Sequence, residues 1–253
     1  MQDNARTVVV GDPAALGAVA TRRNFLRALG MGGSIVLLPS VFAACSDSTD
    51  SLVSPEVNAQ ITSQFPVSLD LSNDVGILNY AYALEQLEAA FYQAVVALPN
   101  FSTLFSAPEQ EVLGDLRNHE VIHRDFLKQA LGGAAIGALS ADFTSVLASR
   151  DTVLAAARQF EDLGVSAYNG AGKYVRDAQY LLLAGKIVSV EARHAAAIRD
   201  ILDPTGKAFA DNTFETILDA NAVERALEPS AVISAVNSTK LVKQTLAVGT
   251  GPS

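Results

Sequence analysis

The sequence of 253 residues predicts an all-α fold organised as a four-helix bundle. Four segments have apolar residues at helical spacing, and each has a glutamate at the centre of its apolar stripe. The order of glutamates, tyrosines and histidines in the first two segments is repeated in the last two. We place the bundle at residues 73–202, between a tether at 45–72 and a C-terminal extension at 203–253.

Residues 1–44 resemble a twin-arginine signal peptide. Arg22 and Arg23 precede an apolar run that ends at Cys45. Pro39 interrupts this run, which is shorter than the roughly 20 apolar residues of a membrane span, so a transmembrane anchor is disfavoured. Because the twin-arginine route exports folded proteins, we expect the protein in the periplasm or cell envelope.

Cys45 is the only cysteine, so the mature domain can hold no internal disulfide. Its setting, Phe42-Ala43-Ala44-Cys45, resembles a lipoprotein cleavage box, although Phe42 stands where leucine is usual. We interpret Cys45 as a lipidation site, with cleavage after Ala43 by ordinary signal peptidase as the alternative. A lipid anchor would be the only contact with a membrane, and the Ser- and Asp-rich tether would follow it.

The chain is acidic, with a formal net charge of −9. Residues 1–44 contain four arginines and two aspartates, so the remainder has a net charge of −11. This charge argues against nucleic acid as a partner and favours solubility.

The first helix is predicted to begin after Ser72 or Asn73, either of which can cap it, and to end before Pro99. When the segment is wound at about 100° per residue, Glu85 lies at the centre of the apolar face. Glu88 lies about 60° away, at the edge of that face.

The second helix is predicted at residues 107–131, with Pro108 in its first turn and two glycines at its end. The weakly patterned residues 134–150 follow. They are long enough to cross the length of a bundle, so the third helix should run parallel to the second.

The third helix, predicted at residues 152–171, has Glu161 at the centre of its stripe. The fourth helix ends at Asp203-Pro204. Two further segments, 214–227 and 231–248, are interpreted as short helices that cover the bundle or a partner.

An internal repeat relates the two halves of the bundle. A glutamate is followed seven residues later by a tyrosine, and then by a Glu-x-x-His pair on the next helix. The halves are Glu85, Tyr92, Glu120 and His123, and Glu161, Tyr168, Glu191 and His194. The repeat favours Glu85 over Glu88, because only Glu85 has a tyrosine at the matching offset.

These residue types in this order predict a metal centre. Residues i and i+3 project from one helical face, so each Glu-x-x-His pair offers a carboxylate and an imidazole to one point. Carboxylates in an apolar stripe need a cation, because isolated buried charges cost several kcal/mol. Four carboxylates balance two divalent cations, and two neutral imidazoles complete the donor set, which suits two iron ions, or manganese as the alternative.

Residues 73–202 resemble the ferritin-like superfamily. The segments FEDLGVSAYNGAG and SVEARHAAAIRDIL are similar to sequences of the exported ferritin-like proteins, a family that includes desiccation-related proteins. The resemblance implies bridging ligands Glu120 and Glu191, terminal ligands Glu85 and Glu161, and one imidazole per metal from His123 and His194. It also implies a long crossover between the second and third helices.

Four other side chains have open interpretations. Tyr92 and Tyr168 could reach back along their own helices to hydrogen-bond a ligating carboxylate, or fill the core as aromatic rings, or do both. His119 is interpreted as a flanking or surface residue. Arg124, one turn after Glu120, could pair with that carboxylate in a metal-free core.

Two functions from different classes follow. The first is an envelope protein whose metal pair reacts with O₂ or peroxide, as an oxidoreductase of ferroxidase, peroxidase or catalase type. The second is a non-catalytic bundle, active in envelope stress or desiccation, in which the metal only holds the helices together. A homo-oligomer is compatible with either, but the tether and the C-terminal extension disfavour a closed iron-storage shell.

Overall fold

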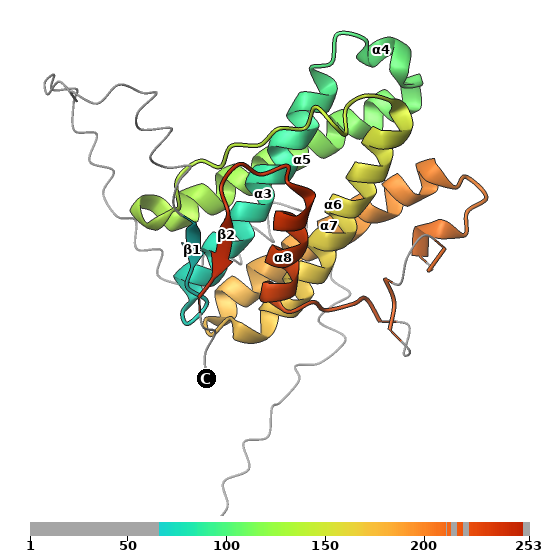
Figure 1. Ribbon diagram of the computed structural model, residues 1–253. Coiled ribbons are helices and arrows are strands. Elements are labelled where there is room, and N and C mark those ends of the chain that lie inside the picture. Colours follow the sequence, from blue (N-terminus) through green and yellow to red (C-terminus); the bar gives the residue numbers. More distant parts are fainter. Residues whose placement is uncertain (1–65, 211, 214–216, 220–222, 250–253) are drawn as a thin grey trace, which may run out of the picture. The chain divides into compact units, whose positions relative to one another are not determined.

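Four long helices form a bundle in the computed structural model, which describes residues 66–210, 212–213, 217–219 and 223–249 (Figure 1). They are α3 (Asp74–Val96), α5 (Ala107–Leu131), α6 (Arg150–Ala171) and α7 (Ala178–Leu202). The predicted all-α class is confirmed. The expected signal peptide, Cys45 and most of the tether lie outside the described residues. No helix in the described part is long and apolar enough to cross a membrane.

Polar side chains fix where the helices begin. Asn73 caps α3 by accepting a hydrogen bond from the Gly76 amide, and Asp177 caps α7 by accepting one from the Gln179 amide. Ser106 and Ser149 head capping boxes at α5 and α6. Each cap satisfies amides that the helix leaves open and stabilises it by about 1 kcal/mol.

The long crossover between α5 and α6 runs along the bundle, so these two helices run parallel, as predicted (Figure 1). Two buried amide side chains of α3 hold the crossover in place. Asn79 donates to the carbonyl of Ala134 and accepts from the amide of Ile136, and Gln86 accepts from the amide of Leu139. A short helix that the sequence pattern did not predict, α4 (Phe101–Leu104), lies between α3 and α5.

The C-terminal extension differs from the expectation of two short helices. Of the two expected helices, α8 (Pro229–Thr239) is found among the described residues, and the chain then enters strand β2 (Leu246–Val248), which pairs in parallel with β1 (Val67–Leu69). The helix ends at Lys240, which adopts a left-handed conformation with φ 57°. β1 lies in the stretch that we assigned to the end of the tether.

The expected helix at residues 214–227 is wrong for the residues that the structure describes there. Leu218 and Glu224 form an antiparallel bridge, which a continuous helix excludes. At the end of this segment the amide of Leu227 donates to the carbonyl of Ser166 on α6.

Buried contacts hold α6 against α7 and against the extension. Arg199 of α7 is fully buried and donates two hydrogen bonds to Asp162 of α6, at 2.8 and 2.6 Å. Gly170 of α6 lies so close to the extension that an ideal Cβ there would stand 1.7 Å from the carbonyl oxygen of Leu227. α6 is thus fixed on both sides before any metal is considered.

Replacing Gly170 with alanine should therefore destabilise the fold by about 1–3 kcal/mol, because the new methyl group forces the extension off the helix. Urea unfolding followed by circular dichroism measures this change. Gly114→Ala is the matched control, since nothing lies within 4 Å of its Cβ position on α5. This control should stabilise the protein by about 0.5–1 kcal/mol. Equal effects of the two variants would contradict the contact.

Candidate metal site

Each of the four long helices places one glutamate in the middle of the bundle. Glu85 of α3, Glu120 of α5, Glu161 of α6 and Glu191 of α7 have no exposed surface. These positions follow from the helical periodicity, because each glutamate shares a face with buried apolar residues. Two histidines that the sequence analysis selected, one on α5 and one on α7, lie beside them.

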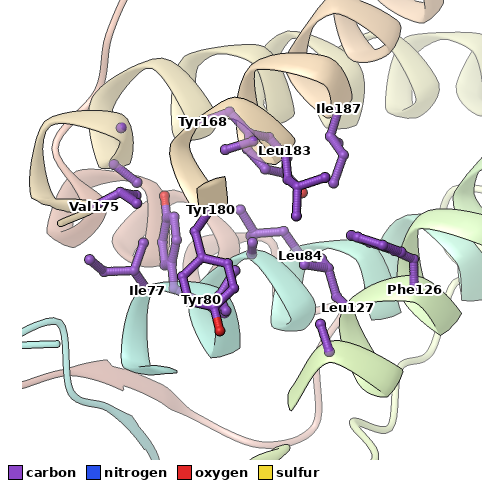
Figure 2. A pocket seen from close by; sticks show the side chains of 16 residues that line it. Ile77, Tyr80, Leu84, Phe126, Leu127, Tyr168, Val175, Tyr180, Leu183 and Ile187 are labelled. Atoms are coloured by element: carbon purple, nitrogen blue, oxygen red, sulfur yellow. The ribbon is translucent and has the colours of Figure 1, made fainter. Parts of the chain in front are cut away.

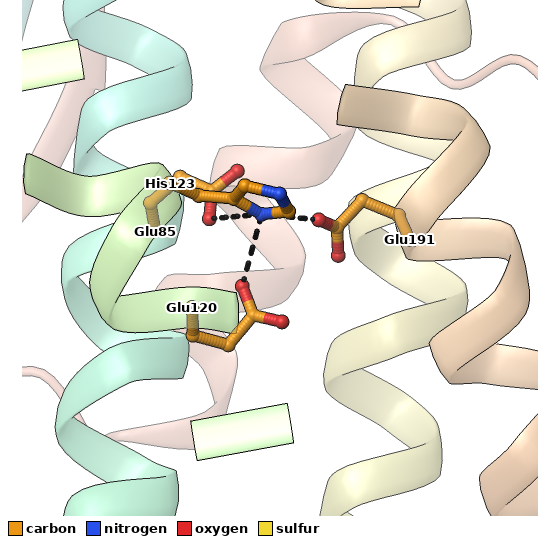
Figure 3. Close-up of side chains that lie close together, drawn as sticks. All are labelled: Glu85, Glu120, His123 and Glu191. Atoms are coloured by element: carbon orange, nitrogen blue, oxygen red, sulfur yellow. Dashed lines mark ion pairs between the residues drawn. The ribbon is translucent and has the colours of Figure 1, made fainter. Parts of the chain in front are cut away.

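His123 stands between three carboxylates (Figure 3). Its Nδ1 lies 2.8 Å from Glu191 Oε1, 3.5 Å from Glu85 Oε2 and 3.5 Å from Glu120 Oε2. The imidazole of α5 therefore meets carboxylates from three different helices at a single nitrogen.

His194 repeats this arrangement in the other half. Its Nδ1 lies 2.7 Å from Glu120 Oε1, 3.4 Å from Glu161 Oε2 and 3.7 Å from Glu191 Oε2. Glu120 and Glu191 thus appear in both clusters, and Glu85 and Glu161 in one each.

The converging atoms are short of hydrogen-bond partners. Although the N···O distances are short, Nδ1 of both histidines and both oxygens of Glu120 and Glu191 make no hydrogen bond of acceptable geometry. Orphaned buried polar atoms are costly and rare. Here the unpartnered atoms lie close to one another, which is the arrangement expected of the donor atoms of a metal site.

Two overlapping groups of side chains could each hold a metal ion. Within a group, the candidate ligand atoms lie within 4.8 Å of one another. The groups are Glu85, Glu120, His123 and Glu191, and Glu120, Glu161, Glu191 and His194. All six candidate ligands from the sequence analysis are therefore brought together, in a donor set of carboxylates and imidazoles that suits iron or manganese.

Without metal, protons must replace the missing positive charge. Burial opposes a charged imidazole, but the contacts with Glu120, Glu191 and Glu85 outweigh it and raise the pKa of His123 to about 12. Burial likewise opposes charge on His194, yet its carboxylate contacts raise its pKa to about 12. Burial raises the pKa of Glu161 to about 8. The cluster therefore holds several protons, and a bound cation would displace them.

The two tyrosines hydrogen-bond the carboxylates, but each bonds the glutamate of the other half. Tyr92 of α3 donates to Glu161 Oε1 at 2.6 Å, and Tyr168 of α6 donates to Glu85 Oε1 at 2.5 Å. Both tyrosines thus fill the core and hydrogen-bond a candidate ligand, as two of the open interpretations had it, but neither reaches back along its own helix. These reciprocal pairs form because α3 and α6 run antiparallel, which sets each tyrosine directly opposite its partner.

His119 has a role that the sequence analysis missed. Its side chain is exposed, as expected, but its Nδ1 lies 2.8 Å from Nε2 of His194, the nitrogen that faces away from the carboxylates. If His194 offers Nδ1 to a metal, its Nε2 carries the proton and donates to His119. Adjacent helices create this contact, so no spacing within the chain could have revealed it.

Arg124 does not pair with Glu120, which removes the ion pair we considered for a metal-free core. Its guanidinium instead pairs with Asp125, at 2.8 Å. Glu88, expected at the edge of the apolar face, is 4 % exposed and lies beside the cluster. Burial, with further contributions from Glu191 and Glu120, raises the pKa of Glu88 well above its usual range.

An apolar pocket lies between α3, α5 and α7 (Figure 2). Leu84 of α3, Leu127 of α5 and Ile187 of α7 line it, and its free volume is about 40 Å³. Tyr168, whose hydroxyl bonds Glu85, is part of the same wall. The space is far smaller than the roughly 300–1,000 Å³ typical of sites for larger ligands, so only a very small molecule would fit.

A comparison with protein families matches residues 73–204 to the ferritin-like domain. The match spans all four long helices and every residue of the two clusters. A search among curated proteins found no match.

The raised pKa values predict how pH affects the metal-free protein. In the folded protein Glu161 keeps a proton that the unfolded chain releases near pH 4.5. Its contribution to the free energy of unfolding therefore decreases as the pH rises from about 4.5 to about 8. The charged histidines stabilise the fold below about pH 6.5, and this contribution is lost progressively toward pH 12. The melting temperature of the metal-free protein should therefore fall by at least about 5 °C between pH 6 and 9.

Metal affinity should show the opposite trend, rising over the same pH range, because cations displace the stored protons. Calorimetric scans of chelator-treated protein, with metal titrations at each pH, measure both. A melting temperature that stays level or rises with pH in the metal-free form would contradict the assignment.

Replacing His119 with alanine should weaken metal binding by about 10- to 100-fold, since His194 loses the partner that orients its ring. Competition against a chromophoric chelator measures the affinity. Asn118→Ala, an exposed neighbour on α5, is the control and should bind as the wild type does. Wild-type affinity in His119→Ala would show that the imidazole contact has no part in binding.

Proposed function

The chain belongs to the ferritin-like domain family, and from this membership and the geometry of its core we propose an exported metalloprotein with a carboxylate-bridged pair of iron or manganese ions that reacts with O₂ or peroxide. One observation carries the proposal: two four-residue clusters share Glu120 and Glu191. A carboxylate that belongs to two adjoining clusters can bind a cation in each of them and so bridge the pair.

The residues fit such a pair. Glu120 and Glu191 would bridge, Glu85 and Glu161 would each bind one ion, and His123 and His194 would each supply Nδ1. The orphaned oxygens and nitrogens of these residues support this assignment. Four carboxylates would neutralise two divalent ions, which accounts for the burial of all four.

When bound, the metal pair supplies the electrons and the open coordination positions for reaction with an oxidant. The protein contributes placement. Tyr92 and Tyr168 hold one oxygen of Glu161 and of Glu85, so each of these carboxylates keeps its other oxygen for the metal. His119 fixes the ring of His194. The apolar walls around the cluster exclude bulk water.

The apolar pocket beside Tyr168 favours a small neutral reactant. The accessible surface of its walls is almost entirely apolar. O₂ makes few hydrogen bonds in water and so loses little free energy on entering, whereas peroxide would give up its hydrogen bonds to water. O₂ is therefore our first choice of oxidant and peroxide the second. Export by the twin-arginine route and lipidation of Cys45 complete the proposal, and both rest on the sequence of residues 1–45.

The test is to load the mature domain with Fe²⁺ without oxygen, add O₂ or peroxide, and follow oxidation by optical absorption. Wild-type protein should oxidise its iron within seconds to minutes and at least tenfold faster than Glu161→Ala, which should lose metal while keeping its helix content. Glu111→Ala, at an exposed position of α5, is the control and should behave as the wild type. Bound iron that responds to neither oxidant would favour the non-catalytic bundle.

A further inference from the structure

Glu88 is a buried carboxyl outside the two clusters. It lies one turn after Glu85 on α3 and is 4 % exposed, and no hydrogen bond or ion pair of Glu88 is found among the described residues. Burying a carboxyl without a partner costs free energy, whether it is charged or neutral. A position so close to the other glutamates therefore calls for an explanation.

The internal repeat identifies the place that Glu88 occupies. Glu88 follows Glu85 by three residues, and Gly164 follows Glu161 by three. The two positions lie halfway between the reciprocal tyrosine and glutamate pairs of α3 and α6. They therefore face each other near the point where the two halves of the repeat meet.

Gly164 leaves the room in which the Glu88 carboxyl lies. An ideal Cβ on Gly164 would stand 3.0 Å from Glu88 Oε1, and only 3.7 Å from Glu191 Oε2. Any side chain at Gly164 would thus press on the Glu88 carboxyl and approach a proposed bridging ligand. Gly114 of α5 and Gly185 of α7 have no atom within 4 Å of their Cβ positions, and Gly170 of α6 approaches backbone atoms, so a close approach to a carboxylate oxygen is found at Gly164 among these glycines.

The side from which Glu88 approaches is also distinctive. Both histidines come from α5 and α7, whereas Glu88 comes from α3 and lies against α6. Glu88 also lines a cavity of about 10 Å³, roughly the room of one water, together with Phe160 and Leu163. Glu88 thus adds a third carboxyl on the side of α3 and α6, which also carry Glu85 and Glu161.

We propose that Glu88 is a fifth carboxylate of the metal centre, admitted by the missing side chain of Gly164, and that it helps to bind the divalent cations. The proposal rests on the proposed function only in requiring that the centre binds metal. A fifth negative charge beside the cluster attracts cations through the low-dielectric core. The repeat would then supply six ligands, and Glu88, where the other half has Gly164, would supply a seventh.

The test measures affinity for Mn²⁺ by competition with a chromophoric chelator, which requires no turnover. Glu88→Gln keeps the shape and removes the charge, so it should bind about 10- to 100-fold more weakly. Gly164→Ala should also bind at least severalfold more weakly, because the methyl group displaces the carboxyl. Gly185→Ala, the matched helical glycine, should bind as the wild type does.

The double variant Glu88→Gln/Gly164→Ala separates this role from packing. If Gly164 acts through Glu88, the double variant should bind no more weakly than Glu88→Gln alone. Wild-type or tighter affinity in Glu88→Gln would overturn the proposal while leaving the proposed function intact. Absence of Mn²⁺ and Fe²⁺ binding in the wild type would overturn both. Circular dichroism of each metal-free variant checks that the helices remain.

Discussion

Four carboxylates without exposed surface stand at the centre of this bundle, and the rest of the structure accommodates them. Each would cost several kcal/mol if it were charged and alone. In the metal-free state the cost is limited by protons, which explains why the pKa of His123 and His194 rises to about 12 and that of Glu161 to about 8. A pair of divalent cations would offset the cost without those protons.

The two halves share one plan but are not equivalent. Each half contributes a buried glutamate followed by a tyrosine and then a Glu-x-x-His pair, and the tyrosines exchange partners across the antiparallel helices α3 and α6. His119 supports the ring of His194, and no described residue bonds the outer nitrogen of His123 in this way. With Glu88 facing Gly164, these differences would give two cations unequal surroundings.

Much of the fold and of the candidate site could be predicted from the sequence, because helical periodicity fixes the face on which a residue lies. Residues such as Glu85 and Glu161 were found from their place in the apolar stripe and from the repeat. Periodicity does not say which helix stands opposite, so the exchange of tyrosine partners and the contact of His119 with His194 were missed. Strand β2 was also missed, since its pairing with β1 depends on residues far away in the sequence.

The most direct measurement of the central claim is the metal content per chain, by plasma mass spectrometry, of the mature domain purified without chelators from cells supplied with iron and manganese. The account predicts close to two iron or manganese ions per chain, because two clusters share Glu120 and Glu191. A folded, helical protein that contains no metal would contradict it and would mean that protons alone keep the four glutamates in the core.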